Sequence, residues 1–463
     1  MELTNFSRVA IIGGGPAGSL TAYFMLDIAK QLGIHLNLDI YEPALYSAPG
    51  PKGCNFCGGI VSETLVQMLA MEGINLPPDV VQRGIDSYFL HTEQGSASIQ
   101  TPLDEMRIAA LYRGAGPLDC IKRSAEISFQ DKVVYKSFDG FLQQLAIQSG
   151  ANVITKRVAE VIREEPFPVV VPKGGEPRRY DLVVGAVGVN GGGIKLFEKT
   201  MPNFKAPQTT TAFLTEIFMD REKVDKYFGN AMHVFLVKIP HVNFAAIVPK
   251  AEYVSVILLG KGVNKESAKA FLSHPDVKKC FPDDIDLSPK SCQCHPKVNI
   301  GLASPVFQDR IVMVGDAGVS RLFKDGVGAA YITSKACATT AMIHGVSKQD
   351  FKQFYLPACK KLDVDNKLGK MVFLTVDLFK WIPILSKGML RMVQREQQPN
   401  VSDKDMSMVL WDTFTGSNTY RSIVKRCLNP FFLTRLFWES FKSLLSRKSE
   451  AKIIDYTATE EKS

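Results

Sequence analysis

Three glycines near the N-terminus have the type and spacing needed to bind a dinucleotide. Gly13, Gly15 and Gly18 match the G-x-G-x-x-G pattern. The first glycine permits a tight turn, the second lets the backbone approach a pyrophosphate, and the third lets a helix pack closely on a strand. Glu42 follows the next predicted strand and can accept hydrogen bonds from ribose hydroxyls. The pattern predicts nucleotide binding; the alternative is a purely structural glycine turn.

A second glycine-rich segment lies about three hundred residues further along the chain. It starts at Gly315 and Asp316 after an apolar run, and continues to Gly326 and Gly328. A Gly-x-Gly pair lets the backbone approach a ring without an intervening Cβ. A helix starting there, near Ala329, would stabilise the negative charge of a reduced flavin. Together the two segments predict FAD in an extended conformation, with its adenosine end near the N-terminus and its ring near residue 326.

The cysteines, and two residues that follow a predicted strand, are further candidates for catalytic or binding roles. Cys54 and Cys57 form a CxxC in a glycine-rich loop, and residues 292–295 add a Cys-x-Cys-His cluster. These cysteines suit a redox dithiol, a metal or iron–sulfur site, or a structural loop. The seven histidines have no metal-ligand spacing, and we predict no metal site. Tyr112 and Arg113 end an apolar strand at 108–111 and are candidates for contacting flavin or substrate.

The elements that would position these residues are those of an α/β fold. Residues 8–12 are short, β-branched and apolar, as in a buried parallel strand. A helix is expected over 16–32 with Gly33 as its stop, followed by a strand over 35–41.

Further strands at hairpin-like spacing predict an inserted antiparallel sheet. These strands cover 87–91, 96–99, 209–219, 232–239, 242–248 and 253–259. A cavity between this sheet and the flavin ring is the expected substrate site. Its candidate walls are Phe213, Phe218, Phe235, Phe244 and Ile257.

The C-terminal quarter is rich in bulky apolar residues. Residues 372–385 and 430–445 are rich in aromatics and leucines interleaved with a few Lys and Arg, as in a helix that lies in a membrane interface. The alternative is a helical appendage that packs on the catalytic core. No apolar run reaches the length of a transmembrane helix.

Composition fits a large intracellular enzyme. The chain has 463 residues, nine cysteines without a disulfide pattern, and a net charge of +8. The mild positive charge is compatible with an anionic membrane or substrate, and is too diffuse for nucleic acid. We expect a Rossmann-like FAD-binding domain (1–80, 116–198 and 299–345), an inserted β-sheet substrate domain (81–115 and 199–298), and a C-terminal helical region (346–463).

These motifs resemble the geranylgeranyl reductase family, within the flavoproteins built like p-hydroxybenzoate hydroxylase. The resemblance rests on the glycine fingerprint, the Cys57-Gly58-Gly59 loop, the Gly315-Asp316 pair, and the stretch 411–416. It implies that Asp316 binds flavin-side hydroxyls, with a structural cap as the alternative, and that Cys57 shapes the pocket or assists protonation.

The predicted site therefore combines both segments with this loop. The cofactor-binding residues are Gly13, Gly15, Pro16, Ala17, Gly18, Glu42, Cys57, Gly58, Gly59, Gly315, Asp316, Gly326, Val327, Gly328 and Ala329. The catalytic candidates are Cys57, Tyr112 and Arg113.

Two departures from the family pattern matter. Val187 stands where hydroxylases of this group, and many reductases, carry an aspartate, which argues against direct NADPH use and hydroxylation. The aromatic substrate motif of the family is weak in residues 242–249. That segment keeps only Phe244 and Pro249, which are the candidate substrate-binding residues.

The sequence thus predicts an FAD-dependent oxidoreductase that reduces carbon–carbon double bonds of a prenyl or related lipid. The electron donor stays open among ferredoxin, NAD(P)H and quinol. A flavin monooxygenase or dehydrogenase of a small hydrophobic molecule is the first alternative, and a non-catalytic binder of prenylated partners is the second. We expect a cytoplasmic protein, with peripheral contact to the inner face of the membrane as an option.

Overall fold

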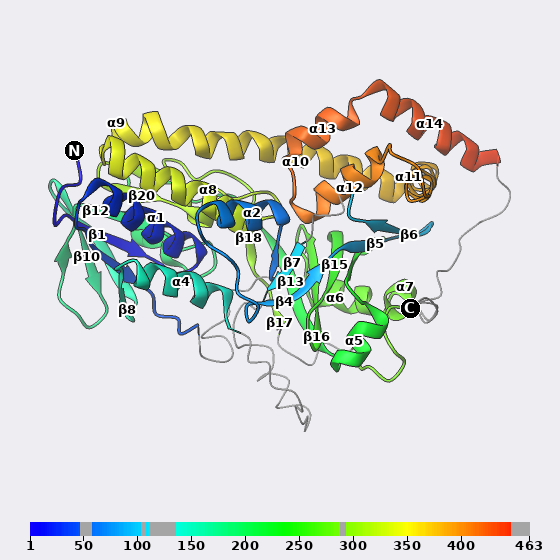
Figure 1. Ribbon diagram of the computed structural model, residues 1–463, viewed down its shortest axis with the longest axis horizontal. Coiled ribbons are helices and arrows are strands. Elements are labelled where there is room, and N and C mark those ends of the chain that lie inside the picture. The colour runs from blue at the N-terminus through cyan, green and yellow to red at the C-terminus, as the bar shows by residue number, and fades with distance from the viewer. Residues whose placement is uncertain (47–57, 103–107, 112–135, 288–292, 446–463) are drawn as a thin grey trace.

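The structure is a computed structural model that describes residues 1–46, 58–102, 108–111, 136–287 and 293–445 (Figure 1). Two sheets form the body of the molecule, and a set of long helices extends across it to one end, where α14 lies (Figure 1).

A six-stranded sheet contains the N-terminal strand. Its order is β19 (Phe307–Gln308), β20 (Ile311–Met313), β12 (Leu182–Gly185), β1 (Arg8–Ile12), β2 (Asn37–Tyr41) and β8 (Asn152–Ile154). All neighbouring strands are parallel except β19 and β20. This mostly parallel arrangement places loops and helix N-termini at the carboxyl ends of the strands.

Successive side chains of a strand point to opposite faces of this sheet, and both faces are covered. Val9 and Ile11 of β1 belong to one core, with α1 (Pro16–Leu32), α4 (Phe138–Gln148) and α8 (Gly326–Thr339). Ala10 and Ile12 belong to a second core on the other face. A three-stranded sheet contributes to that second core, with β9 (Val158–Glu164), β10 (Phe167–Pro172) and β11 (Arg178–Arg179).

A second, eight-stranded sheet is antiparallel except for one parallel pair, β14 with β5. Its strands are β17 (Gln293–Cys294), β13 (Thr209–Phe218), β16 (Tyr253–Gly260), β15 (Val242–Pro249), β14 (Ala231–Leu236), β5 (Ser87–Thr92) and β6 (Gly95–Gln100), with β18 (Lys297–Asn299) beside β13. One face packs on α5 (Arg221–Tyr227), α6 (Lys265–Leu272) and α7 (Pro275–Lys278). The other face packs on the C-terminal helices.

A small sheet connects these units. It consists of β3 (Ile60–Val61), β7 (Ile108–Leu111) and β4 (Val81–Ile85), with α2 (Glu63–Met71) after β3. Short turns of helix in the described ranges are η2 (Gly193–Phe197), η3 (Gly315–Ala317), η4 (Thr340–His344) and η5 (Phe351–Tyr355).

The C-terminal region is helical. Its helices are α9 (Lys348–Asp350), α10 (Leu356–Trp381), α11 (Pro383–Glu396), α12 (Asp405–Thr415), α13 (Tyr420–Cys427) and α14 (Pro430–Leu445). Within the described ranges, none of the helices combines the length and the apolar character needed to cross a bilayer.

The predicted fold class is confirmed: a Rossmann-like sheet, an inserted largely antiparallel sheet, and a C-terminal helical region. Helix α1 has the expected bounds because its signals are local, with Pro16 at the first turn and Gly33 in a left-handed conformation at φ 68°. The second strand begins at Asn37 instead of residue 35. His35 instead uses its backbone to pair with Asn5 and Phe6.

Candidate functional site

The glycine loop lies where β1, β2 and β12 end. Gly13 has a φ of 105°, and its N–H donates to the Tyr41 carbonyl at 2.9 Å. A Cβ on Gly13 would lie 2.3 Å from the Ala186 carbonyl oxygen, and one on Gly18 would lie 1.8 Å from the Gly13 carbonyl oxygen. The backbone therefore requires glycine at the first and third positions of the motif.

The middle glycine differs from the other two because its backbone conformation does not require glycine. Gly15 precedes α1 with φ −67° and ψ −170°, an extended conformation open to any residue. No side chain of the described residues caps this helix at Gly15, and Pro16 occupies its first turn. The N-terminus of α1 thus keeps the positive character that binds phosphate.

Glu42 closes the same loop from the end of β2. Its Oε2 accepts a hydrogen bond from the Gly14 N–H at 2.7 Å and from the Tyr46 hydroxyl at 3.2 Å. Its Oε1 accepts from the Ala44 N–H at 2.7 Å. A carboxylate offers about four acceptor positions, so these three bonds hold Glu42 in place and leave room for a ribose hydroxyl.

The two distant glycine segments meet in space. A Cβ on Gly315, whose φ is 59°, would lie 2.6 Å from the Cβ of Ala17 in the first turn of α1. The Ser334 hydroxyl on α8 donates to the Ala17 carbonyl at 2.8 Å. A Cβ on Gly326 would lie 3.9 Å from Oδ1 of Asp316, so Asp316 lies beside the start of α8.

The N-terminus of α8 carries its own cap, which the sequence analysis did not anticipate. Oδ1 of Asp325 accepts a hydrogen bond from the Gly328 N–H at 3.1 Å, and its Oδ2 accepts one from Arg321 at 2.6 Å. Burial raises the pKa of Asp325 to about 6. The cap occupies the N–H of Gly328, while Gly326 and Val327 form the first turn that would face a flavin ring.

The C-terminal stretch singled out by the resemblance packs on this helix start. A Cβ on Gly416 would lie 2.8 Å from the Cβ of Asp325. The buried ammonium of Lys324 donates to the Asp412 and Asn418 carbonyls at 2.7 and 2.9 Å. It also lies 4.0 Å from the centre of the Tyr420 ring, and burial lowers the pKa of Lys324 to about 7. Lys324 therefore ties the helical region to the start of α8.

The Gly58-Gly59 pair lies against the large sheet. A Cβ on Gly58 would lie 2.2 Å from Cδ1 of Ile257 on β16. The ammonium of Lys250, which is 1% exposed, donates to the Gly59 carbonyl at 2.7 Å and to the Leu111 carbonyl at 3.2 Å. One buried lysine thus joins the segments that precede and follow the predicted catalytic candidates. Those candidates, Cys57, Tyr112 and Arg113, lie outside the described residues, as does Cys54.

Glu216 on β13 is a titratable group on the same sheet face. Glu216 pairs across strands with Ser255, and Ser255 lies two residues from Ile257, so all three side chains share one face. Burial raises the pKa of Glu216 to about 7, although attraction to Lys250 and a hydrogen bond to Ser255 lower it. No sequence motif indicated Glu216 or Lys250; the available signals were a charged residue within strand β13 and a lysine directly after the apolar strand β15.

Phe244 lies at the centre of an aromatic cluster next to α8. Its ring stacks on Phe373 of α10 at 5.4 Å, and lies 5.3 Å from Phe414 of α12 and 6.1 Å from Phe323. Phe323 stands three residues before Gly326. The cluster therefore joins the large sheet, the helical region and the start of α8.

Two residues that were expected to line the substrate cavity lie on the opposite face of the large sheet. Phe213 and Phe235 belong to the core beneath α5, α6 and α7, because strand alternation turns them away from Phe244 and Ile257. Pro249 is buried at the end of β15, directly before Lys250.

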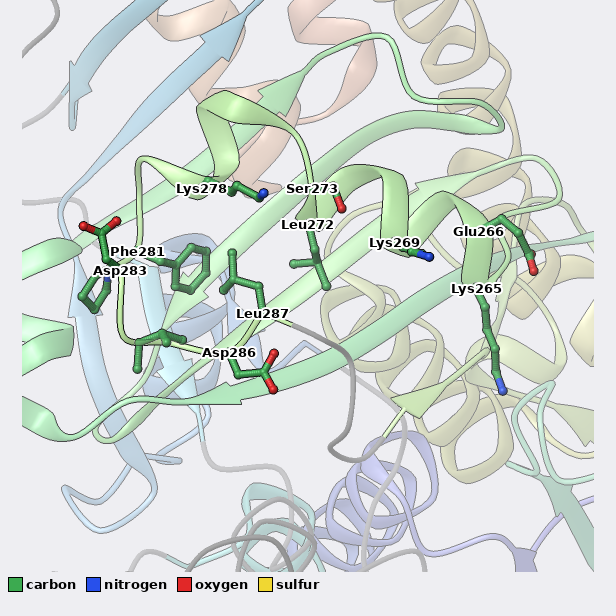
Figure 2. A pocket seen from close by; sticks show the side chains of 12 residues that line it. Lys265, Glu266, Lys269, Leu272, Ser273, Lys278, Phe281, Asp283, Asp286 and Leu287 are labelled. Atoms are coloured by element: carbon green, nitrogen blue, oxygen red, sulfur yellow. The ribbon is translucent and has the colours of Figure 1, made fainter.

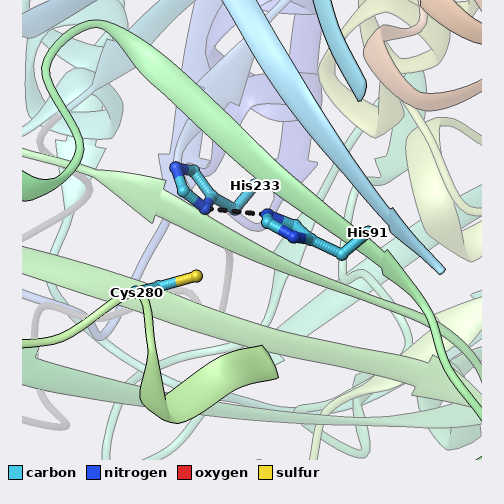
Figure 3. A group of neighbouring side chains, drawn as sticks. All are labelled: His91, His233 and Cys280. Carbon is cyan, nitrogen blue, oxygen red and sulfur yellow. Dashed lines mark hydrogen bonds between the residues drawn. The ribbon is translucent and has the colours of Figure 1, made fainter. Parts of the chain in front are cut away.

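A buried histidine pair lies on the α6–α7 face of the large sheet (Figure 3). His91 Nε2 and His233 Nδ1 are 3.1 Å apart, and His91 Nδ1 lies 2.9 Å from the Ser96 hydroxyl. Cys280 lies beside the pair, with the three ligand atoms all within 4.8 Å of one another. Burial lowers the pKa of His91 to about 4, so both rings are neutral at pH 7. The structure thus brings together three side chains whose spacing in the sequence did not indicate a cluster.

This pair predicts a loss of stability in mild acid. An unfolded histidine has a pKa near 6.5, so between pH 6.5 and 4 the unfolded chain binds a proton that native His91 does not. We expect the free energy of unfolding to fall by about 2 kcal/mol from pH 7 to pH 5 through His91. Urea unfolding at both pH values measures this loss.

His91→Gln should reduce the pH dependence and leave the part that comes from His233, whose pKa is also lowered by burial. An unaltered slope in His91→Gln would contradict the neutral pair. Zn²⁺ binds neutral imidazole, so a rise in the unfolding midpoint of the wild-type protein on adding Zn²⁺ would instead indicate a metal site made by His91, His233 and Cys280.

A hollow between α6, α7 and the following loop contains none of the predicted site residues (Figure 2). Lys265, Lys269 and Lys278 line it together with Asp283 and Asp286. Its lining mixes both signs of charge and belongs to the face opposite Phe244, so we do not assign the flavin site to it.

Comparison with known proteins shows the fold. No protein-family model and no curated protein sequence matches the chain. A flavin-dependent brominase of known structure is 14% identical, with a TM-score of 0.58, over 91% of this chain and 98% of the brominase. The halogenase PltM, solved with phloroglucinol and FAD, is 11% identical, with a TM-score of 0.59, over 94% and 96%. The chain has a flavoprotein fold.

A monooxygenase shares this fold as well. The p-nitrophenol 4-monooxygenase from Pseudomonas putida is 13% identical, with a TM-score of 0.55, over 90% of this chain and all of the enzyme. The fold expected from the wider hydroxylase-like group is thus confirmed, whereas membership of the geranylgeranyl reductase family stays a prediction.

Proposed function

We propose that this chain is an FAD-dependent oxidoreductase. The observation that carries the proposal is the meeting of the two glycine segments, with the N-terminus of α1 at one end and the start of α8 at the other. Glu42 suits the adenosine ribose, and Asp316 suits the flavin-side hydroxyls. FAD in the structural neighbour PltM supports the same choice of cofactor.

The substrate we propose is a hydrophobic molecule with a carbon–carbon double bond, such as a prenyl lipid. The aromatic cluster around Phe244 lies next to the start of α8 and presents rings from three elements. Val187 replaces the aspartate that hydroxylases of this group, and many reductases, carry, which argues against hydroxylation and against direct NADPH use. When bound and reduced, FAD supplies a hydride to one alkene carbon, and an external donor restores its electrons.

We further propose that Glu216 supplies the proton to the second alkene carbon. Its side chain shares the sheet face that Gly58 contacts, and burial raises the pKa of its carboxyl to about 7. Lys250 holds Gly59 and Leu111 on the same side of the sheet. The C=C π bond is then replaced by two C–H bonds, and Glu216 recovers a proton from solvent.

A flavin monooxygenase of a small hydrophobic molecule is the second candidate, because a monooxygenase and two halogenating enzymes share the fold. Anaerobic assays separate the two reactions. The enzyme, reconstituted with FAD and reduced with dithionite, is incubated with geranylgeranyl lipids and analysed by mass spectrometry.

The expected product has gained two hydrogen atoms per reduced bond without oxygen. A product that forms only with oxygen and contains one of its atoms would establish the monooxygenase instead. Protein that stays colourless after incubation with FAD would refute both and leave a non-catalytic binder.

A further inference from the structure

Large hydrophobic side chains are exposed mainly in one part of the molecule. In the part of the chain that the structure describes, twenty-two such side chains are exposed, and fifteen of them lie between residues 346 and 445. Soluble proteins rarely expose apolar residues in contiguous groups, so this concentration indicates an interaction surface.

Helix α14 carries the most continuous group. Phe431, Phe437 and Leu444 are 74%, 72% and 65% exposed, and Trp438 is 52% exposed. Phe431 and Trp438 are seven residues apart, and so are Phe437 and Leu444, so each pair lies on one side of the helix, two turns apart. The opposite side of α14 packs on the protein. A Cβ on Gly388 of α11 would lie 2.0 Å from the Ser440 hydroxyl, so the two helices are in close contact.

The polar side of α14 is fixed by ion pairs. Glu439 is buried and faces Arg391 at 3.4 Å and Lys442 at 3.3 Å. Arg435 pairs with Asp403 and Asp405. These ion pairs fix the rotation of α14 about its axis, and its apolar side therefore faces solvent. Figure 1 shows α14 at one extremity of the molecule, beyond α11 and α13.

The charge of the molecule is concentrated in the same region. Residues 346–445 contain sixteen Lys and Arg against nine Asp and Glu, so they carry seven of the eight net positive charges of the chain. Lys387 on α11 and Lys425 on α13 are exposed, and both helices contact α14. An exposed apolar helix face within a cationic region is complementary to an anionic lipid surface.

We propose that α14 lies in the surface of an anionic phospholipid bilayer, with Phe431, Phe437, Trp438 and Leu444 among the acyl chains. Two other occupants are less suited. A second copy of the chain would bring two cationic regions together. Residues 446–463 follow α14 directly but are mostly polar and charged, so they offer little apolar surface to cover it. The proposal does not depend on the flavin chemistry.

Vesicle co-sedimentation tests the proposal with the full-length protein. One set of vesicles is pure phosphatidylcholine, and the other has roughly one quarter replaced by phosphatidylserine. We expect binding to the phosphatidylserine vesicles that weakens as salt is raised. The triple variant Phe437→Gln/Trp438→Gln/Leu444→Gln should lower the affinity roughly tenfold or more.

The matched control alters exposed apolar residues away from the helical region. Phe6 and Met71 are 64% and 79% exposed, and Phe6→Gln/Met71→Gln should bind as the wild type does. Lys387→Gln/Lys425→Gln should weaken only the binding to phosphatidylserine vesicles.

Three results would overturn the proposal. The first is equal vesicle binding by the triple variant and the wild type. The second is no vesicle binding by the wild type together with a dimer, seen by analytical ultracentrifugation, that the triple variant abolishes; this would assign the face to a second copy. The third is vesicle binding that appears only after residues 446–463 are deleted, which would show that the tail covers the face.

Discussion

Gly15→Val is expected to give a folded protein that has lost FAD. The conformation of Gly15, φ −67° and ψ −170°, is extended, and a β-branched residue adopts it without strain. A side chain at this position would instead occupy the space where the backbone approaches the pyrophosphate. We expect the affinity for FAD to fall on the order of 100-fold, or about 2.7 kcal/mol. Flavin absorbance of the purified protein, with titration of added FAD, measures the change.

Gly13→Ala provides the contrast that separates binding from folding. Its Cβ would meet the Ala186 carbonyl oxygen at 2.3 Å, and its φ of 105° is costly for alanine. This variant should lose thermal stability, whereas Gly15→Val should keep the circular dichroism and melting temperature of the wild-type apoprotein. A Gly15→Val protein that retains its yellow colour would show that the pyrophosphate does not bind at this loop.

The parts of the fold that could be predicted from the sequence are those whose signals lie within the element itself. The signals that start and end helix α1, Pro16 and Gly33, lie at the two ends of the helix itself. The strands of the large sheet show apolar runs between turns. The predicted start of the second strand at His35 was wrong because the groups that hydrogen-bond to the His35 backbone belong to Asn5 and Phe6, about thirty residues away. Which face a strand residue occupies depends on the whole sheet, and this is why Phe213 was misplaced.

The polar centres of the site could not be predicted because their partners are distant backbone atoms. Lys250 bonds carbonyl oxygens of Gly59 and Leu111, which lie 191 and 139 residues away. Lys324 bonds a carbonyl of Asp412 in the helical region. No residue pattern marks a carbonyl oxygen as the future partner of a lysine. The glycines, whose role is local geometry, could therefore be predicted from the sequence, whereas Lys250 and Lys324, whose roles depend on tertiary contacts, could not.

Glu216→Gln should abolish most turnover while leaving FAD binding intact. Loss of a general acid typically costs 10²- to 10⁴-fold in rate, and we expect a decrease in kcat of about 100-fold or more. The acid form of Glu216 is the proton donor, and its pKa is about 7, so kcat of the wild-type enzyme should decline as the pH rises through 7. Glu216→Gln should lose this decline, because glutamine does not titrate.

A second substitution distinguishes a proton donor from a residue that only stabilises the sheet. Lys250 lowers the pKa of Glu216 by attraction to its carboxylate, so the uncharged variant Lys250→Met should move the alkaline decline to higher pH. Ser255→Ala removes a hydrogen bond that also lowers this pKa, and should shift the decline in the same direction without touching Gly59 or Leu111. A purely structural Glu216 would leave the pH profile in place in both variants. Parallel shifts would identify the titrating group as Glu216, since the two substituted side chains share their effect on the pKa of its carboxyl.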